Sequence, residues 1–195
     1  MNATSLSKTP LLIALLLAAG MAATRFHHFG SAIHLPDASL AIFFLAGFYL
    51  RPALFLPAFL AEAALIDYTA IAYAGVSDWC VTPAYGFLIP TYATLWFAGR
   101  WYAARHQQHW RTLVPLVAAV AISTTLAFLI SNGSFYLFSG RYPDLGWTEY
   151  AARVATYFPP YALSTLMYVF FAAALHAVAV AATRMQTGIT FRGPE

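Results

Sequence analysis

Long apolar segments separated by short polar connections fill most of this 195-residue sequence. A helix that spans a membrane needs about 20 mostly apolar residues, because the hydrocarbon core of a bilayer is about 30 Å thick. Segments of this kind predict six helices, over residues 9–26, 36–50, 52–73, 80–100, 113–130 and 160–183. We therefore expect an all-α integral membrane protein, with six transmembrane helices in a single transmembrane domain over residues 1–195.

Polar residues and prolines mark the boundaries of several predicted helices. Asp37 with Ser39, and Ser77 with Asp78, are residue types that favour helix N-termini. Pro90, inside the fourth segment, predicts a kink in that helix. The connection over residues 132–159 is long and rich in Tyr, Trp and Gly, which is typical of a lid or a re-entrant element.

The composition supports the membrane class and excludes others. Hydrophobic residues make up 61% of the chain and charged residues only 9%, which is too little charge to cover a soluble globule. The basic residues stand singly at segment ends and form no stripe, so we expect no nucleic-acid partner. The sequence contains no phosphate-binding loop of the Gly-x-x-x-x-Gly-Lys-Ser/Thr type, so we expect this chain to bind no nucleotide.

The distribution of Lys and Arg predicts an orientation in the membrane, because cytoplasmic loops carry more of these residues. With six spans, one side of the bundle holds Lys8, Arg51, Arg100, Arg105, Arg111, Arg184 and Arg192, and the other side holds Arg25, Arg141 and Arg153. We therefore expect a multi-pass protein of the bacterial inner membrane with both termini in the cytoplasm.

Polar residues that could carry chemistry converge on the outward side of this topology. They come from four separate parts of the chain and comprise His28, Asp67, Cys80, Tyr85 and Arg153. Glu149 and Arg153 are four residues apart, so an ion pair between them is an alternative to a site role. On the cytoplasmic side we expect His106 and His109 to be solvated, and His176 to be packed and hydrogen-bonded.

Cys80, the one cysteine, is the most informative of these residues. A thiolate is a soft metal ligand and a strong nucleophile. Free cysteines are also common as small buried hydrophobic residues, so a purely structural role stays open. Ala14, Ala18 and Ala22 in the first segment are spaced to let another helix approach closely, within this protein or in a partner.

Several passages together resemble a known family of membrane proteins. They are Arg25-Phe26-His27-His28-Phe29, Pro36-Asp37-Ala38-Ser39, Ile66-Asp67-Tyr68 and the segment from Asp78 to Gly86, which contains Cys80. With six short helices and an Ala-rich first helix, the chain resembles the substrate-binding S components of energy-coupling-factor transporters. Within that group it is most similar to the small cobalamin-transporter family called BtuM.

This resemblance implies an S-component-like bundle with an outward-facing ligand pocket and a function in cobalamin uptake. It implies that Cys80 ligates the cobalt of a base-off corrinoid, and that His28, Asp67, Tyr85 and Arg153 surround the ligand. We expect a thiolate on cobalt to promote loss of an upper cyanide ligand. The resemblance also implies that Ala14, Ala18 and Ala22 contact a coupling subunit that works with ATPases, unless the protein acts alone.

Two other functions remain open from the residues themselves. A cobalt or nickel permease could use His28, Cys80 and Asp67 as ligands, although the sequence lacks paired metal ligands at helical spacing deep in a span. A membrane thiol enzyme could use the same three residues as nucleophile, base and carboxylate, although no nucleophile-elbow signature is present.

Overall fold

The structure is a computed structural model that describes residues 8–25, 35–144 and 146–190 of the chain. Within these ranges all regular elements are helical, which confirms the predicted all-α class. The elements are α1 (Lys8–Arg25), α2 (Ser39–Tyr49), α3 (Phe55–Ala74), η2 (Asp78–Cys80), η3 (Pro83–Phe87), α4 (Leu88–Ala103), η4 (Trp110–Thr112), α5 (Leu113–Phe138) and α6 (Trp147–Thr190), where η denotes a short 3-10 helix.

Three helical stretches in the described part of the chain are long and apolar enough to cross a membrane, namely Phe55–Ala74, Trp110–Phe138 and Trp147–Met185. The apolar helices Thr9–Arg25 and Ser39–Tyr49 are shorter. Many large apolar side chains lie on the outside of the bundle, and Val114 and Leu163 are 69% and 67% exposed. Such a surface indicates a membrane protein, because lipid covers exposed apolar side chains at no hydrophobic cost.

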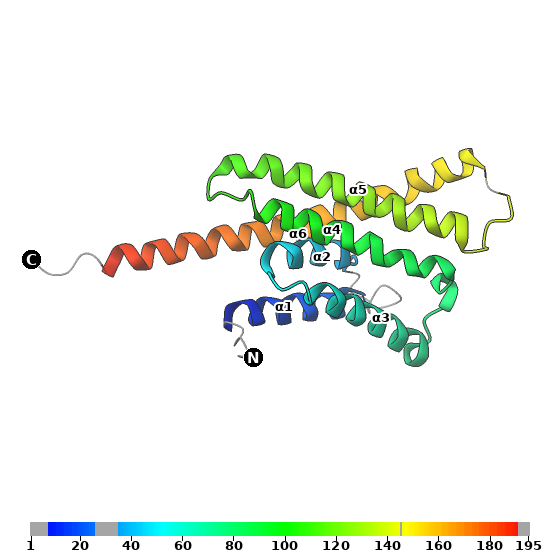
Figure 1. Cartoon of the computed structure of the whole chain (residues 1–195), viewed down its shortest axis with the longest axis horizontal. Coiled ribbons are helices and arrows are strands. Elements are labelled where there is room, and N and C mark those ends of the chain that lie inside the picture. Colours follow the sequence, from blue (N-terminus) through cyan, green and yellow to red (C-terminus); the bar gives the residue numbers. More distant parts are fainter. Residues whose placement is uncertain (1–7, 26–34, 145, 191–195) are drawn as a thin grey trace, which may run out of the picture.

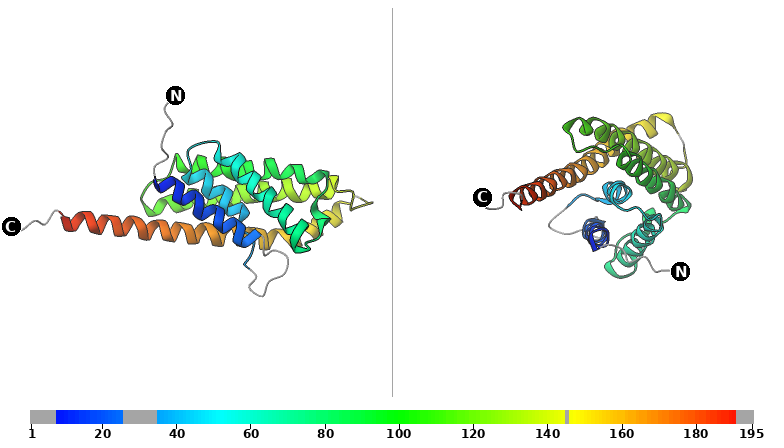
Figure 2. Two further views of the ribbon diagram at one scale, coloured as in Figure 1. Left: turned by 90° about the horizontal axis from the view of Figure 1, so that it is seen from below. Right: turned by 60° about the vertical axis from the view of Figure 1, so that its left-hand side comes forward.

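Helix α2 lies at the centre of the bundle, with the other helices around it (Figure 1; right view of Figure 2). Every residue from Ser39 to Gly47 is buried. Helix α2 is apolar along almost its whole length, and the longer helices pack around it as the core of the bundle. Its Phe43 ring stacks on the Tyr92 ring of α4 with 4.2 Å between centroids.

Two glycines allow the backbones of α2 and α4 to touch. A Cβ atom on Gly47 would collide with the carbonyl oxygen of Trp96, and a Cβ atom on Gly99 would collide with the carbonyl oxygen of Phe44. Close backbone approach at small residues is a common way for membrane helices to associate, since it maximises van der Waals contact. These two helices therefore form the most tightly packed part of the fold.

The fourth predicted helix differs from the expectation at its start. Residues 80–87 are not α-helical: Cys80 ends η2, Pro83 begins η3, and α4 starts only at Leu88. Ser77 does act as a cap, accepting a hydrogen bond from the Trp79 amide. Pro90 then falls in the first turn of α4, where a missing N–H costs nothing, so the predicted mid-helix position of this proline was wrong.

The predicted long connection over residues 132–159 was also wrong. Helix α5 continues to Phe138 and α6 begins at Trp147, so only a short connection remains between them. Tyr136 fixes this connection, because its hydroxyl accepts from the Gly146 amide at 2.8 Å and donates to the Gly146 carbonyl at 3.0 Å. Helix α6 runs through Pro159 and Pro160 rather than starting beside them.

Helix α6 is much longer than a bilayer requires. Its 44 residues extend over about 66 Å at 1.5 Å per residue, against about 30 Å of hydrocarbon. Figures 1 and 2 show that its C-terminal part projects beyond the bundle, at the end where α1 begins.

The glycine contacts between α2 and α4 give a direct test of the packing. We expect Gly99→Ala to lower the free energy of unfolding by about 3 kcal/mol, because the two backbones must separate to admit a methyl group. Gly20→Ala is the matched control, since its Cβ would lie 3.8 Å from Ile42 Cδ1 in ordinary contact. Thermal unfolding in detergent measures both; equal stability of the two variants would contradict the packing described.

Candidate functional site

A buried ion pair joins Arg25, the last residue of α1, to Asp67 in the C-terminal half of α3. Nε of Arg25 donates to Oδ1 of Asp67 and Nη2 donates to Oδ2, both at 2.6 Å. The Arg25 side chain is 10% exposed and that of Asp67 21%. This paired geometry matches the planar guanidinium to the planar carboxylate and satisfies both charges away from water.

The remaining donor of Arg25 reaches two more helices. Nη1 donates to the Ser39 hydroxyl of α2 at 3.0 Å and to the Tyr92 hydroxyl of α4 at 2.6 Å. Asp37 lies 3.8 Å from this nitrogen and accepts from both the amide and the hydroxyl of Ser39. One guanidinium therefore ties α1, α2, α3 and α4 together. Helix α2 begins at Ser39 with Ala38 as its N-cap, and Asp37 precedes the helix and accepts from the Ser39 amide.

Tyr85 connects this cluster to the segment that carries Cys80. The Tyr85 hydroxyl, in η3, donates to Oδ2 of Asp67 at 2.7 Å. Burial, and then this hydrogen bond, raise the pKa of Tyr85 well above its usual value, so the phenol keeps its proton and remains a donor. The irregular segment from Asp78 to Phe87 is thereby held against the end of α3.

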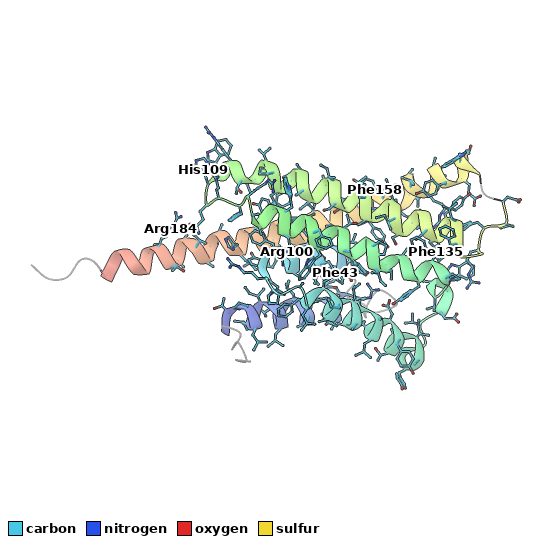
Figure 3. The ribbon with its side chains drawn as sticks, in the orientation of Figure 1. Phe43, Arg100, His109, Phe135, Phe158 and Arg184 are labelled. Atoms are coloured by element: carbon cyan, nitrogen blue, oxygen red, sulfur yellow. The ribbon has the colours of Figure 1, made fainter. Side chains whose placement is uncertain are left out.

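These residues form one wall of a cavity of about 440 Å³. The cavity lies between the ends of α1 and α3, the η2–η3 segment, α4, the end of α5 and the start of α6. Tyr92, Tyr142, Tyr157 and Tyr161 contribute aromatic lining, with Phe135 of α5 labelled at this end of the bundle in Figure 3. A volume of this size and a mostly apolar lining with a few polar groups are typical of ligand sites.

Cys80 lies in the lining beside Trp79 and Val81 and is exposed. Partial burial of the thiol, and then the negative charge of Asp67, raise its pKa, whereas Arg141 acts in the opposite direction. Arg141 is held near this segment because its guanidinium lies 4.1 Å from the Trp79 ring centroid. The free thiol is therefore protonated near neutral pH, and a metal would have to displace that proton.

Two polar atoms in the cavity have no hydrogen-bond partner among the described residues. They are Nε of Arg153 and Oδ1 of Asn132, and both are buried. The Arg153 guanidinium rests between two rings, 4.7 Å from the centroid of Tyr142 and 5.0 Å from that of Tyr157. A buried polar atom without a partner is costly, so these atoms favour a ligand that brings hydrogen-bonding groups into the cavity.

The structure brings four of the five sequence-predicted ligand residues into this one cavity, namely Asp67, Cys80, Tyr85 and Arg153. His28, the fifth, lies outside the described residues. Glu149 accepts from the Tyr136 hydroxyl at 3.5 Å. No described residue forms an ion pair with Arg153, so the alternative pairing with Glu149 is absent from this part of the chain.

The alanines of α1 have different environments. Ala14 belongs to the buried core and Ala18 packs against it, whereas Ala22 is exposed. Two of the three thus contribute to packing within the bundle. The predicted contact with a coupling subunit stays a prediction.

Sequence reasoning missed the roles of Arg25, Tyr92 and Asn132. Arg25 was counted as a charge on the outward side and as part of a passage that carries the family resemblance, but its pairing was not predicted, although ionisable residues in apolar segments usually pair. Tyr92 lies within a predicted apolar segment, where one polar residue gives no indication of which helix it faces. Asn132 was placed in the predicted connection over residues 132–159, whereas α5 continues to Phe138.

The described residues contain no group of three or more His, Cys, Asp and Glu side chains that could hold a metal ion. No protein-family model matches the chain, and no curated protein matches it significantly.

The Arg25–Asp67 pair predicts a strong dependence of stability on Asp67. We expect Asp67→Ala to lower the free energy of unfolding by about 3 kcal/mol, because it leaves the buried guanidinium without its counter-charge. Tyr85→Phe removes only one hydrogen bond to the same carboxylate and should cost about 1 kcal/mol. Thermal unfolding of both variants in detergent is the measurement. Equal losses in the two variants would show that the pair does not anchor the fold.

Proposed function

We propose that this chain is a cobalamin-binding uptake transporter of the bacterial inner membrane, with the Cys80 cavity as its outward-facing site. The observation that carries the proposal is the meeting of a single thiol, an unpartnered guanidinium nitrogen and several tyrosines in one cavity. Cobalamin offers complementary chemistry, with a cobalt ion, a flat macrocycle, peripheral amides and a phosphate.

One protein ligand is enough for the cobalt of a corrinoid. The macrocycle supplies the four equatorial nitrogens, so the protein needs to provide only an axial donor, and the cavity contains one thiol. A permease for free cobalt or nickel would instead have to supply most of the ligands itself. The proposal therefore favours a corrinoid over a bare metal ion.

Size also bears on how the ligand would bind. The cavity of about 440 Å³ lies within the range of about 300–1,000 Å³ found for sites of drug-sized molecules. A corrinoid with its nucleotide is larger than such a molecule. We infer that the cobalt-bearing face enters toward Cys80 while the rest of the macrocycle extends through the open mouth.

The proposed roles follow from the contacts of each side chain. Cys80 coordinates cobalt from below and displaces the nucleotide base. Arg153 meets an amide or the phosphate, because its Nε atom has no partner among the described residues. Asp67 acts mainly as a positioning residue, since Arg25 and Tyr85 already occupy its oxygens.

Thiolate coordination would also favour loss of an upper cyanide. The electron-rich sulfur weakens the bond trans to it, and cyanide leaves with the electron pair of that bond. The thiol proton is taken up by the departing cyanide, and water fills the vacated position. Cobalt keeps its oxidation state, so the step needs no reductant.

Other molecules supply the energy for uptake by this chain. Uptake proceeds either with an ATP-driven coupling complex or by equilibration followed by trapping inside the cell. Growth on limiting cobalamin after deletion of the host's coupling-module genes separates these two cases.

The optical spectrum of the corrin tests the function directly. We expect purified protein mixed with cyanocobalamin to change the spectrum to that of a base-off, thiolate-ligated form, with release of cyanide. Cys80→Ser should bind the macrocycle without this change, because a hydroxyl is a poor ligand for cobalt. An unchanged spectrum with the natural protein, or the same change with Cys80→Ser, would refute Cys80 as the ligand.

Thiolate coordination also predicts a pH dependence when the ligand is aquacobalamin, which carries no cyanide to take up the proton. Because the pKa of Cys80 is raised, binding releases a proton, and affinity should rise about tenfold per pH unit below that pKa. Arg141→Gln removes the charge that lowers the pKa of Cys80, so the curve of affinity against pH for this variant should move to higher pH. Spectral titrations between about pH 6 and pH 8 measure both curves. A flat profile would contradict a proton-releasing thiol.

A further inference from the structure

A second cavity, of about 530 Å³, lies at the opposite end of the bundle. It is bounded by α2, the end of α4, the connection over residues 104–112, the start of α5 and the projecting part of α6. In Figure 3, His109 and Arg184 label this end of the molecule, and Phe135 labels the end with the Cys80 cavity. No residue lines both cavities.

The second cavity has an apolar floor and a polar rim. The floor is formed by side chains from α2, α5 and α6, namely Phe44, Phe48, Leu116, Val169 and Ala173. The rim comes from the connection between α4 and α5, with His106, Gln107, Gln108, His109 and Trp110. This arrangement suits an amphiphilic molecule whose apolar part enters the bundle while its polar part stays at the surface.

The charges around the rim favour an anionic group. None of the lining residues is acidic. Two arginines of the same connection rest on tryptophan rings, Arg105 at 4.2 Å from the Trp101 centroid and Arg111 at 5.7 Å from the Trp110 centroid. Both arginines are next in sequence to residues that line the cavity, His106 and Trp110, and Arg184 of α6 belongs to the lining itself.

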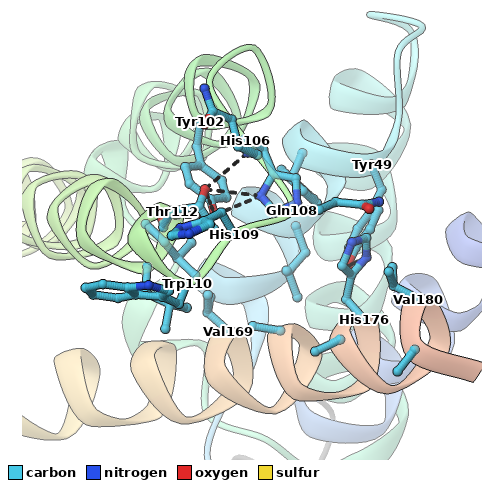
Figure 4. Close-up of a pocket in the computed structure, with 18 of the residues that line it drawn as sticks. Tyr49, Tyr102, His106, Gln108, His109, Trp110, Thr112, Val169, His176 and Val180 are labelled. Carbon is cyan, nitrogen blue, oxygen red and sulfur yellow. Dashed lines mark hydrogen bonds between the residues drawn. The ribbon is translucent and has the colours of Figure 1, made fainter. Parts of the chain in front are cut away.

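Two histidines supply hydrogen-bonding groups inside the mouth (Figure 4). His176 of α6 bonds through Nδ1 to the Tyr49 hydroxyl at 3.2 Å, which confirms the prediction that this histidine is hydrogen-bonded. His106 bonds through Nδ1 to the Tyr102 hydroxyl at 3.0 Å, and the two imidazole centroids are 5.6 Å apart. His106 was expected to be solvated, but its Nε2 atom is buried and has no hydrogen-bond partner in the described part of the chain.

His106 acts as a neutral group in this setting. Burial, and then the neighbouring His176, lower its pKa, so the imidazole is uncharged near neutral pH. In the tautomer that carries its ring proton on Nε2, Nδ1 accepts from the Tyr102 hydroxyl and Nε2 is a donor. A ligand oxygen at the rim would satisfy this atom.

We propose that this cavity binds an anionic phospholipid from the adjoining leaflet of the membrane. One acyl chain lies along the apolar floor, and the phosphate sits at the rim near His106, Trp110 and Arg111. Basic pockets at the cytoplasmic ends of membrane helices recognise anionic head groups in this way, and a leaflet presents such lipids at high local concentration. The site is separate from the Cys80 cavity and does not depend on the corrinoid.

Native mass spectrometry tests the proposal with delipidated protein in a neutral detergent. Phosphatidylglycerol is added to one sample and phosphatidylcholine to another, and the lipids retained per chain are counted. We expect one tightly retained phosphatidylglycerol and weaker retention of phosphatidylcholine. Arg111→Gln should weaken the retention of phosphatidylglycerol about fivefold, because one rim charge is lost.

A matched pair of variants shows whether the bound lipid occupies this cavity. Ala177 and Ala174 are both exposed on α6, but only Ala177 lines the cavity. Ala177→Trp fills the space and should abolish the retained phosphatidylglycerol, whereas Ala174→Trp should keep it. Size-exclusion chromatography and thermal unfolding show that both variants are folded. Equal retention of the two lipids, equal retention by the two tryptophan variants, or displacement of the lipid by a planar aromatic solute would overturn the proposal.

Discussion

The ion pair between Arg25 and Asp67 is the interaction on which the rest of the structure depends. It joins residues of α1 and α3 that are 42 positions apart in sequence, and Nη1 of the same guanidinium bonds to α2 and α4. Removing Arg25 would leave the Asp67 carboxylate without its paired cation, and removing Asp67 would leave the guanidinium with only the more distant Asp37, at 3.8 Å, as counter-charge. The relative positions of these four helices, and hence of the cavity wall that they form, follow from this pair.

The pair also determines which groups of the cavity are available to a ligand. Arg25 and Asp67 neutralise each other, and Tyr85 donates its proton to the same carboxylate. The polar groups that remain in the lining include the Cys80 thiol, Nε of Arg153 and Oδ1 of Asn132. A nearly neutral cavity of this kind suits a large ligand rich in amides better than a bare divalent cation, whose charge would need several carboxylates or thiolates.

Hydropathy alone was enough to predict the helical class and the existence of six α-helices. It also placed both ends of α1, α2 and α3 within a few residues of where they lie. The failures are local. Two 3-10 stretches, Asp78–Cys80 and Pro83–Phe87, precede α4, and Pro83 is the first residue of the second stretch. Helix α5 continues through Asn132 and Gly133, beyond the end that hydropathy predicts. Helix α6 continues through Pro159 and Pro160, which a membrane helix tolerates more readily than a soluble one.

The candidate site was predictable in part, because polar residues at one end of a membrane bundle must meet one another or a ligand. That argument identified Asp67, Cys80, Tyr85 and Arg153. It could not identify Arg25 as the partner of Asp67, nor Tyr92 and Asn132 as lining residues, since helix rotation and long-range pairing leave no trace in local composition. The second cavity was not predictable either, because it exists only where the long α6 meets the connection between α4 and α5.

The most direct test of the central claim is X-ray absorption at the cobalt edge, measured on purified protein loaded with aquacobalamin. If Cys80 is the axial ligand, the cobalt has one sulfur neighbour in addition to the four macrocycle nitrogens and the water. A cobalt surrounded by nitrogen and oxygen alone would contradict the assignment of this cavity as a thiolate-ligated corrinoid site.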